Sequence, residues 1–171
     1  MDRNALILLI EDSEDDCILM QRAFRKAKIL NPLLTIRSGE EAMEYLSGLG
    51  KYNDRALHPL PSLVLLDLKM PGIDGFEVLK WIRGQPWLKA LRVVILTSSN
   101  QIWDVNLAYK LGANSFLVKP VDLDRFVELS QAVSGYWLWL DKEPEAIRPP
   151  PVVPQSPTEK PPEPLGGTLP S

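Results

Sequence analysis

Five polar residues of this sequence directly follow short apolar runs, and their side chains are of kinds that take part in chemistry. They are Glu11, Asp12, Asp67, Thr97 and Lys119. Short continuous apolar runs are typical of buried parallel strands, and in an open parallel sheet the residues after the strands meet at one edge. We therefore expect three carboxylates, a hydroxyl and an ammonium group to lie together at the carboxyl edge of one sheet.

This combination of groups suits magnesium-assisted transfer of a phosphoryl group. Carboxylates that lie close together repel, and burial raises the pKa of at least one of them unless a divalent cation compensates the charge. Magnesium prefers oxygen ligands and commonly serves phosphates. Asp67 is then a candidate nucleophile towards phosphorus, because a carboxylate is ionised at neutral pH and needs no general base. The metal ion and Lys119 would offset charge on the phosphoryl oxygens, and Thr97 would donate a hydrogen bond to one of them.

Each of these residues also has a simpler interpretation when it is taken alone. An aspartate such as Asp67 after a strand is often a turn former, and the acidic pair followed by Ser13 is a typical helix cap. The threonine and the lysine are common strand-end residues. The occurrence of a suitable group after each of four strands favours the functional interpretation. The single histidine, His58, is predicted to be an ordinary loop residue, and Cys17 to be a packing residue.

The segments around these residues alternate between strands and amphipathic helices. The predicted strands cover residues 5–10, 34–37, 63–66, 93–96 and 116–118. Apolar residues at helical spacing predict helices over residues 17–27, 39–49, 75–83, 101–111 and 123–140. Five βα units joined by right-handed crossovers predict an α/β fold, with a doubly wound five-stranded parallel sheet and helices on both of its faces.

Length and composition narrow the class of protein. The chain has 171 residues, and its 19 Lys and Arg against 22 Asp and Glu give a net charge of −3, which argues against a nucleic-acid-binding protein. One cysteine excludes an internal disulfide and a cysteine-rich zinc site. No apolar run approaches the length of a membrane span, and residues 5–10 are too few for a signal-peptide core. We therefore expect a cytoplasmic protein.

Proline is concentrated near the end of the sequence. Ten of the 16 prolines fall within residues 144–171, a segment with almost no large apolar side chains. Such a segment cannot bury enough surface to offset its chain entropy. We therefore predict one folded domain over residues 4–142 and a disordered or polyproline II tail over residues 143–171.

Four motifs contain the candidate residues and extend well beyond them. The motifs are LLIEDSEDD, LVLLDLKMPGIDGFEVL, VVILTSS and GANSFLVKP. With these motifs the chain resembles the receiver domain of two-component response regulators over about residues 4–140. The resemblance implies a flavodoxin-like (βα)5 fold with strand order 2-1-3-4-5. It also implies a signalling domain that phosphorylates and dephosphorylates itself rather than a metabolic enzyme.

The resemblance implies roles for individual positions. Asp67 matches the aspartate that is phosphorylated. Mg²⁺ would be held by the side chains of Glu11, Asp12 and Asp67. The backbone carbonyl of Lys69 would be a further ligand, and Lys119 would pair with the phosphate.

A second group of positions matches the family's switch. Thr97 corresponds to the switch hydroxyl, and Phe116 stands at the position of the switch aromatic. A phenylalanine has no hydroxyl to donate, so its inward and outward rotamers must differ by packing alone. The resemblance also implies a cis peptide bond between Lys119 and Pro120.

The resemblance further implies a stand-alone response regulator. A histidine kinase or a phosphotransfer protein would supply the phosphoryl group. The long loop of residues 48–61 resembles that of single-domain regulators that partner bacterial phytochrome-type histidine kinases. The segment after residue 140 is too short and too rich in proline for a DNA-binding or enzymatic domain. The signal would therefore pass by contact to a downstream protein, on the face formed by the fourth helix, the last strand and the last helix. Otherwise the protein would compete for phosphoryl groups as a relay or sink.

Some alternatives stay open at this point. Tyr136 and Trp137 in the aromatic segment GYWLWL are core residues by helical spacing, whereas Trp139 would mark a homodimer or partner surface. A phosphorylation-independent adaptor would have the same fold, although this sequence keeps every group that the chemistry needs. A phosphatase with an aspartyl nucleophile usually has a second acid two residues later, where this chain has Lys69.

Overall fold

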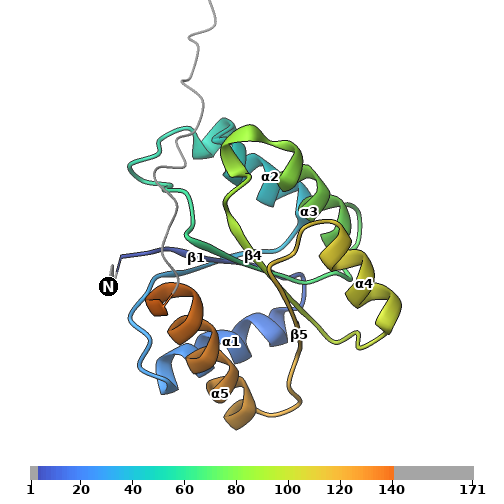
Figure 1. Cartoon of the computed structure of the whole chain (residues 1–171). Helices are drawn as coiled ribbons and strands as arrows, with labels where there is room; N and C mark the ends of the chain where they lie inside the picture. Colours follow the sequence, from blue (N-terminus) through green and yellow to red (C-terminus); the bar gives the residue numbers. More distant parts are fainter. Residues whose placement is uncertain (1–3, 141–171) are drawn as a thin grey trace, which may run out of the picture.

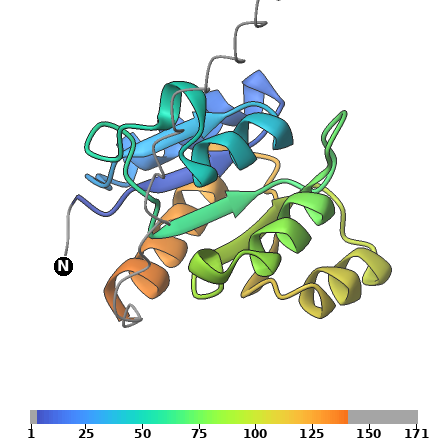
Figure 2. The same cartoon turned by 90° about the horizontal axis from the view of Figure 1, so that it is seen from above.

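A computed structural model describes residues 4–140, in which five parallel strands form one sheet (Figure 1). The strand order is β2-β1-β3-β4-β5, and Figure 2 shows the strands running in one direction. The strands are β1 (Ile7–Ile10), β2 (Leu33–Ile36), β3 (Leu63–Leu66), β4 (Arg92–Thr97) and β5 (Ser115–Val118). The predicted fold class and strand order are confirmed. The predicted tail, residues 143–171, lies outside the described residues.

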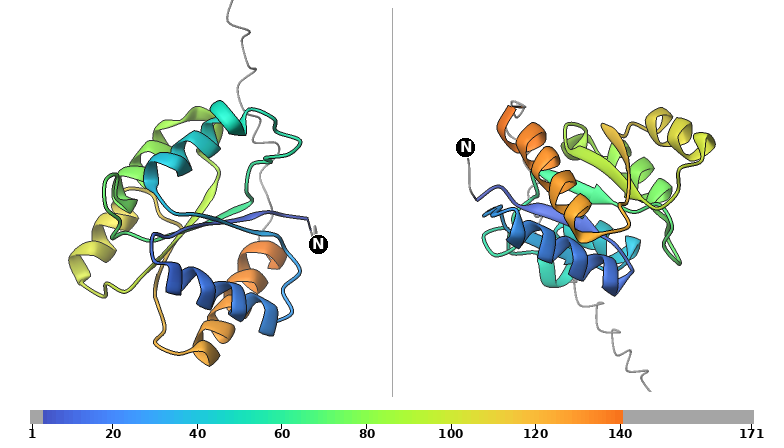
Figure 3. Two further views of the ribbon diagram at one scale, coloured as in Figure 1. Left: turned by 180° about the vertical axis from the view of Figure 1, so that it is seen from behind. Right: turned by 90° about the horizontal axis from the view of Figure 1, so that it is seen from below.

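Helices cover both faces of the sheet. They are α1 (Glu14–Lys26), α2 (Gly39–Ser47), α3 (Gly75–Gly84), α4 (Ile102–Lys110) and α5 (Leu123–Ser134). Short turns of 3-10 helix, η1 (Gly50–Tyr52) and η2 (Pro86–Leu88), follow α2 and α3. Helices α1 and α5 lie side by side on one face, and α2, α3 and α4 lie on the other (Figures 1 and 3).

The core consists of two apolar layers separated by the sheet. Along β1, Leu8 and Ile10 point into the layer under α2 and α3, while Ile7 and Leu9 point into the layer under α1 and α5. This alternation arises because successive side chains of a strand point to opposite faces. The central strands β1, β3 and β4 are buried throughout, as their continuous apolar runs predicted.

The prediction that residues 116–118 are buried on both faces was wrong. Strand β5 is at the edge of the sheet, and Val118 is 46% exposed. An apolar run shows that a strand is compatible with burial, whereas its position in the sheet decides how many neighbours cover it.

The last helix is shorter than the predicted helix over residues 123–140. Helix α5 ends at Ser134, and Gly135–Leu140 forms a π-helical segment, η3. A π-helix bonds residue i to i+5, so the spacing that would have placed Tyr136 in the core no longer holds, and this side chain is 56% exposed. Trp137 packs partly buried against the α1–α5 layer. The side chain of Trp139 lies outside the described part of the structure.

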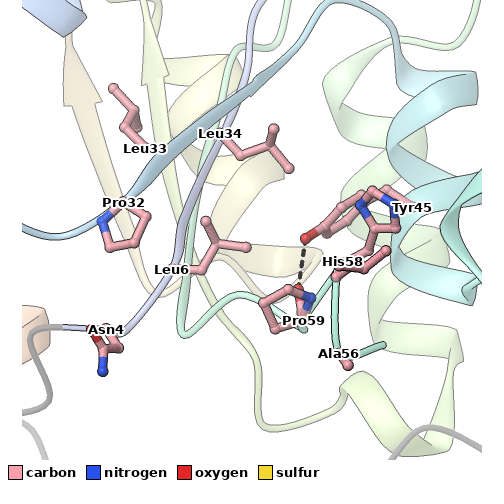
Figure 4. Close-up of a pocket in the computed structure, with 10 residues that line it drawn as sticks. Asn4, Leu6, Pro32, Leu33, Leu34, Tyr45, Ala56, His58 and Pro59 are labelled. Carbon is pink, nitrogen blue, oxygen red and sulfur yellow. Dashed lines mark hydrogen bonds between the residues drawn. The ribbon is translucent and has the colours of Figure 1, made fainter. Parts of the chain in front are cut away.

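The long loop between α2 and β3 folds against the amino edge of the sheet. The Tyr45 hydroxyl donates a hydrogen bond to the Pro59 carbonyl at 2.6 Å (Figure 4), and the Arg55 guanidinium donates to the carbonyls of Tyr45 and His58. His58 packs edge-on against Tyr52, with ring centroids 5.1 Å apart, which confirms it as a loop residue. A shallow, mainly apolar pocket of about 440 Å³ lies here, between the loop and the starts of β1 and β2.

Within residues 4–140, no helix combines the length and the apolar character that crossing a membrane requires.

Candidate functional site

The strand register brings the candidate residues to one edge of the sheet. Ile10 of β1 pairs with Leu66 of β3, so the acidic residues that follow both strands are neighbours. Strand β4 extends further, and Thr97 at its end pairs with Val118 of β5. The Lys119 backbone N–H then donates to the Thr97 carbonyl at 2.8 Å. The predicted convergence at the carboxyl edge is therefore present in the fold.

Three carboxylates form the centre of the site. Ligand oxygens of Glu11, Asp12 and Asp67 all lie within 4.8 Å of one another. Glu11 is 1% exposed and Asp67 is 5% exposed, while Asp12 is half-buried. Burial is the main cause that raises the pKa of Glu11, to about 7. A cluster of three carboxylates offers the hard oxygen donors that a divalent cation such as Mg²⁺ prefers.

The buried ammonium group of Lys119 completes the cluster. Its Nζ lies 3.2 Å from Asp67 Oδ2 and 2.8 Å from Asp16 Oδ2, and it also forms an ion pair with Glu11. Burial works against the ammonium form, but hydrogen bonds to Asp16 and Glu11 outweigh that effect and raise the pKa of Lys119 above its ordinary value. The lysine therefore stays charged beside the candidate nucleophile.

The expectation of a cis peptide before Pro120 was wrong. Every described peptide bond is trans, including the one between Lys119 and Pro120. The trans isomer is the intrinsically favoured one even before proline. Lys119 reaches the carboxylates from a trans backbone because β5 ends directly beside β4 at the same edge.

Sequence reasoning missed Asp16. This residue lies in the first turn of α1, which Ser13 caps by accepting a hydrogen bond from the Asp16 N–H at 3.3 Å. Ser13 therefore has the capping role that its position predicted, and the capped turn directs Asp16 towards Lys119. The available indication was its place next to Cys17, which is buried on the inner face of the helix.

The loop after β3 is held tightly behind Asp67. The Lys69 N–H points to Asp67 Oδ1 at 3.5 Å, and the Gly75 N–H donates to the Leu68 carbonyl at 3.1 Å. A Cβ atom on Gly75 would lie only 2.1 Å from the Asp67 carbonyl oxygen. The start of α3 therefore packs directly on the backbone of the candidate nucleophile, and only glycine permits this approach.

The two candidate switch residues lie in different surroundings. Thr97 is fully buried, and its hydroxyl accepts a long hydrogen bond of 3.4 Å from the Ser99 N–H. Phe116 packs, partly buried, against the α2–α4 layer. Its backbone N–H donates to the Tyr109 hydroxyl at 3.2 Å. The ring of Phe116 thus belongs to the core rather than to the carboxylate cluster.

A second residue that sequence reasoning missed is Asp104 on α4. The inner positions of α4 are not all apolar, because the buried residues of this helix are Asp104 and Ala108. Asp104 contacts Ser99 and Lys69, so it lies at the border of the site rather than on the outer face of its helix.

Comparison with known proteins agrees with the motifs. A family model described as the response regulator receiver domain matches residues 7–131. Response regulator Rcp1 of Synechocystis sp. is 38% identical over 133 residues, which cover 78% of this chain and 88% of that protein. The structure of the phosphorylated cyanobacterial phytochrome response regulator RcpA is similar, with a TM-score of 0.76, 33% identity, and coverage of 82% of this chain and 99% of that one. The Mn(2+)-bound form of Rcp1 has a TM-score of 0.73 at 37% identity, with the same coverage.

Proposed function

The chain belongs to the response regulator receiver family, a family of signalling domains, and on that premise we propose that Asp67 accepts a phosphoryl group. The donor is a phosphohistidine on a histidine kinase or phosphotransfer protein. An Asp67 carboxylate oxygen forms the new bond to phosphorus as the bond to the imidazole nitrogen breaks, and the electron pair of that bond stays with the imidazole. The product is an acyl phosphate.

One observation carries this proposal. The Lys119 ammonium lies 3.2 Å from the Asp67 carboxylate, and two further carboxylates crowd the same point. An anionic nucleophile beside a fixed buried cation is arranged to receive a group whose oxygens carry negative charge. Lys119 would keep its contact with this position after transfer, now through a phosphoryl oxygen.

The donor set also fits Mg²⁺. Glu11, Asp12 and Asp67 would supply carboxylate oxygens, and the Lys69 carbonyl would supply a neutral oxygen from the loop behind Asp67. When bound, the ion would withdraw charge from the phosphoryl oxygens. The Mn(2+)-bound form of Rcp1 shows that a similar protein holds a divalent cation.

We expect phosphorylation to change the conformation of residues at the same edge of the sheet, and this change would carry the signal to a downstream protein. Thr97 would turn its hydroxyl to a phosphoryl oxygen, and Phe116 would adjust by packing. The face over α4 and β5 carries exposed large apolar side chains, among them Trp103, Val118 and Val121, and such a patch favours contact with a downstream protein. The names of similar proteins, RcpA among them, support a phytochrome-type histidine kinase as the partner.

Labelling with acetyl phosphate and Mg²⁺, followed by intact-mass measurement of the full chain, tests the proposal. We expect the wild type to gain one phosphoryl group, and Asp67→Asn to gain none while keeping its circular dichroism spectrum. Chelation of Mg²⁺ should abolish labelling. Asp124→Asn is the matched control because Asp124 is an exposed aspartate on α5, and it should label like the wild type. An unlabelled wild type would instead support the phosphorylation-independent adaptor.

A further inference from the structure

We propose that Asp104 is a positioning residue that ties α4 to the loop behind Asp67 until Asp67 is phosphorylated. This inference rests on the proposed function and extends it to the way in which the site communicates with α4. Asp104 is in the first turn of that helix, and its neighbour Trp103 belongs to the exposed apolar face.

Asp104 is a buried charge with two specific partners. It is 4% exposed, and its Oδ2 accepts a hydrogen bond from the Ser99 hydroxyl at 2.5 Å. The Lys69 ammonium lies 3.3 Å from the same oxygen. The Ser99 hydrogen bond, followed by the contact with Lys69, holds the pKa of the Asp104 carboxyl below its usual value. A carboxylate is costly to bury, so its partners fix where the start of α4 can lie.

Both partners of Asp104 are also connected to the candidate site. Ser99 follows β4, and its backbone N–H donates to the Thr97 hydroxyl at 3.4 Å. Lys69 belongs to the loop after β3, and its backbone N–H points to Asp67 Oδ1 at 3.5 Å. Asp104 is therefore the middle link of a chain of contacts that runs from Asp67 through the first turn of α4 to Thr97.

Phosphorylation would weaken this chain of contacts at both of its ends. A phosphoryl group adds about −1.5 to −2 units of charge at neutral pH, next to the chain position from which the flexible Lys69 side chain extends. The Lys69 ammonium would then have a second, stronger anion within reach. Thr97 would turn its hydroxyl to a phosphoryl oxygen and release Ser99. Asp104 would lose hold of both partners, and α4 would be free to shift.

Thermodynamic linkage gives this tie a measurable consequence. A contact that exists only in the unphosphorylated state opposes phosphorylation by as much as it stabilises that state. Removing the tie should therefore loosen α4 before phosphorylation and make phosphorylation more favourable. In the phosphorylated protein the same change should have no effect on α4.

The test uses Asp104→Asn in the full chain. Asparagine keeps the shape of the side chain and the acceptor for Ser99 but removes the charge that holds Lys69. In the unphosphorylated protein we expect amide hydrogen exchange over residues 102–110 to rise about fivefold. The labelled fraction at limiting acetyl phosphate with Mg²⁺ should rise by a similar factor. With saturating donor, exchange in α4 should match that of the wild type.

Lys69→Met tests whether Asp104 acts through its ion pair, because the backbone carbonyl of Lys69 stays in place. It should reproduce the effect of Asp104→Asn, and the double variant should show no further effect. Glu128→Gln removes one exposed negative charge from α5, so it is the control for the change in net charge that Asp104→Asn makes. Non-additivity would show that Asp104 acts through Lys69. A purely structural ion pair would keep its effect on α4 after phosphorylation, whereas the proposed tie would lose it.

Several outcomes would overturn the inference. They are unchanged α4 exchange in both single variants, effects of the two substitutions that multiply, or an Asp104→Asn effect that persists after phosphorylation. Failure of the proposed function is a separate result, in which the wild type itself remains unlabelled. The tie between Asp104 and Lys69 would then be judged from exchange in the unphosphorylated protein, and its role in phosphorylation would be refuted.

Discussion

At the scale of single residues, the positive charge of Lys119 offsets the repulsion among the buried carboxylates of the cluster. An ammonium group has three hydrogens to donate, and the partners of this one include Glu11, Asp16 and Asp67. Each of these carboxylates would be an unpaired or repelled charge without it. The lysine that we propose as the phosphate partner therefore also stabilises the carboxylate cluster before phosphorylation.

This double role predicts a destabilised Lys119→Met variant. Removing one partner of a buried ion pair costs about 3 kcal/mol, although protonation of Glu11, whose pKa burial raises to about 7, relieves part of it. Added Mg²⁺ should recover more stability in this variant than in the wild type, because it compensates the same carboxylates. Thermal melting with chelator and with Mg²⁺ measures both effects.

Lys26→Met is the control for this experiment. Its ammonium forms an exposed ion pair with Asp124, so we expect a change of less than about 1 kcal/mol and no dependence on Mg²⁺. Equal losses of stability in the two lysine variants would contradict the prediction, because they would show that burial of the Lys119 ion pairs does not determine the size of the effect.

At the scale of elements, α3 positions Asp67 through close backbone contact. Asp74 caps the helix, and its side chain and that of Glu77 each accept a hydrogen bond of 3.0 Å from the other residue's backbone N–H. This capping box begins the helix at Gly75, directly against the end of β3. The helix start and the nucleophile are therefore placed together.

Gly75→Ala should disturb this arrangement. The new Cβ would lie 2.1 Å from the Asp67 carbonyl oxygen and 2.8 Å from the Leu68 Cα, and both of these are backbone atoms that cannot rotate away. We expect a loss of about 2 kcal/mol or more in the free energy of unfolding, together with weaker labelling of Asp67. Urea denaturation and intact-mass labelling measure the two effects.

Gly84→Ala, in the same helix, provides the matched comparison. A Cβ there meets nothing within 4 Å, so alanine should be neutral or stabilising by up to about 1 kcal/mol. If the two glycine variants had the same free energy of unfolding and the same labelling of Asp67, the close backbone contact at Gly75 would not be what positions Asp67.

At the scale of the whole molecule, the two ends of the sheet have different characters. The carboxyl edge gathers the charged groups of the site. The amino edge is covered by the loop between α2 and β3, whose His58 and Pro59 line a mainly apolar pocket together with Tyr45 of α2 (Figure 4). Parallel strands produce this separation, because all of their carboxyl ends face one way. The α5 helix runs between the two ends, and η3 contacts the amino end, where Arg92 donates to the Trp137 carbonyl at 3.3 Å.

Removal of residues 144–171 should leave the melting temperature nearly unchanged, because this proline-rich segment has few large apolar side chains to bury. Removal of residues 135–171 is the control. It also deletes Trp137, which packs against the α1–α5 layer, so it should lower the melting temperature clearly. A drop of many degrees in the shorter deletion would show that the tail packs on the domain.

The class of fold and the main set of polar groups follow from local features of the sequence. Continuous apolar runs define central strands, and the residue that follows a run lies at a strand end wherever the strand is placed. The sequence alone therefore predicts that Glu11, Asp12, Asp67 and Lys119 lie together, as they do in the structure. These properties are local, so a short stretch of chain contains all the information that they need.

The remaining features depend on how distant parts of the chain pack together. Asp16 contacts Lys119 across 103 positions of the chain, and Asp104 of α4 contacts Lys69 of the loop after β3. The exposure of β5 depends on its place at the edge of the sheet, and that of Tyr136 on a change of helix type after Ser134. Each of these depends on which distant segments become neighbours, and spacing along the chain carries no information about that.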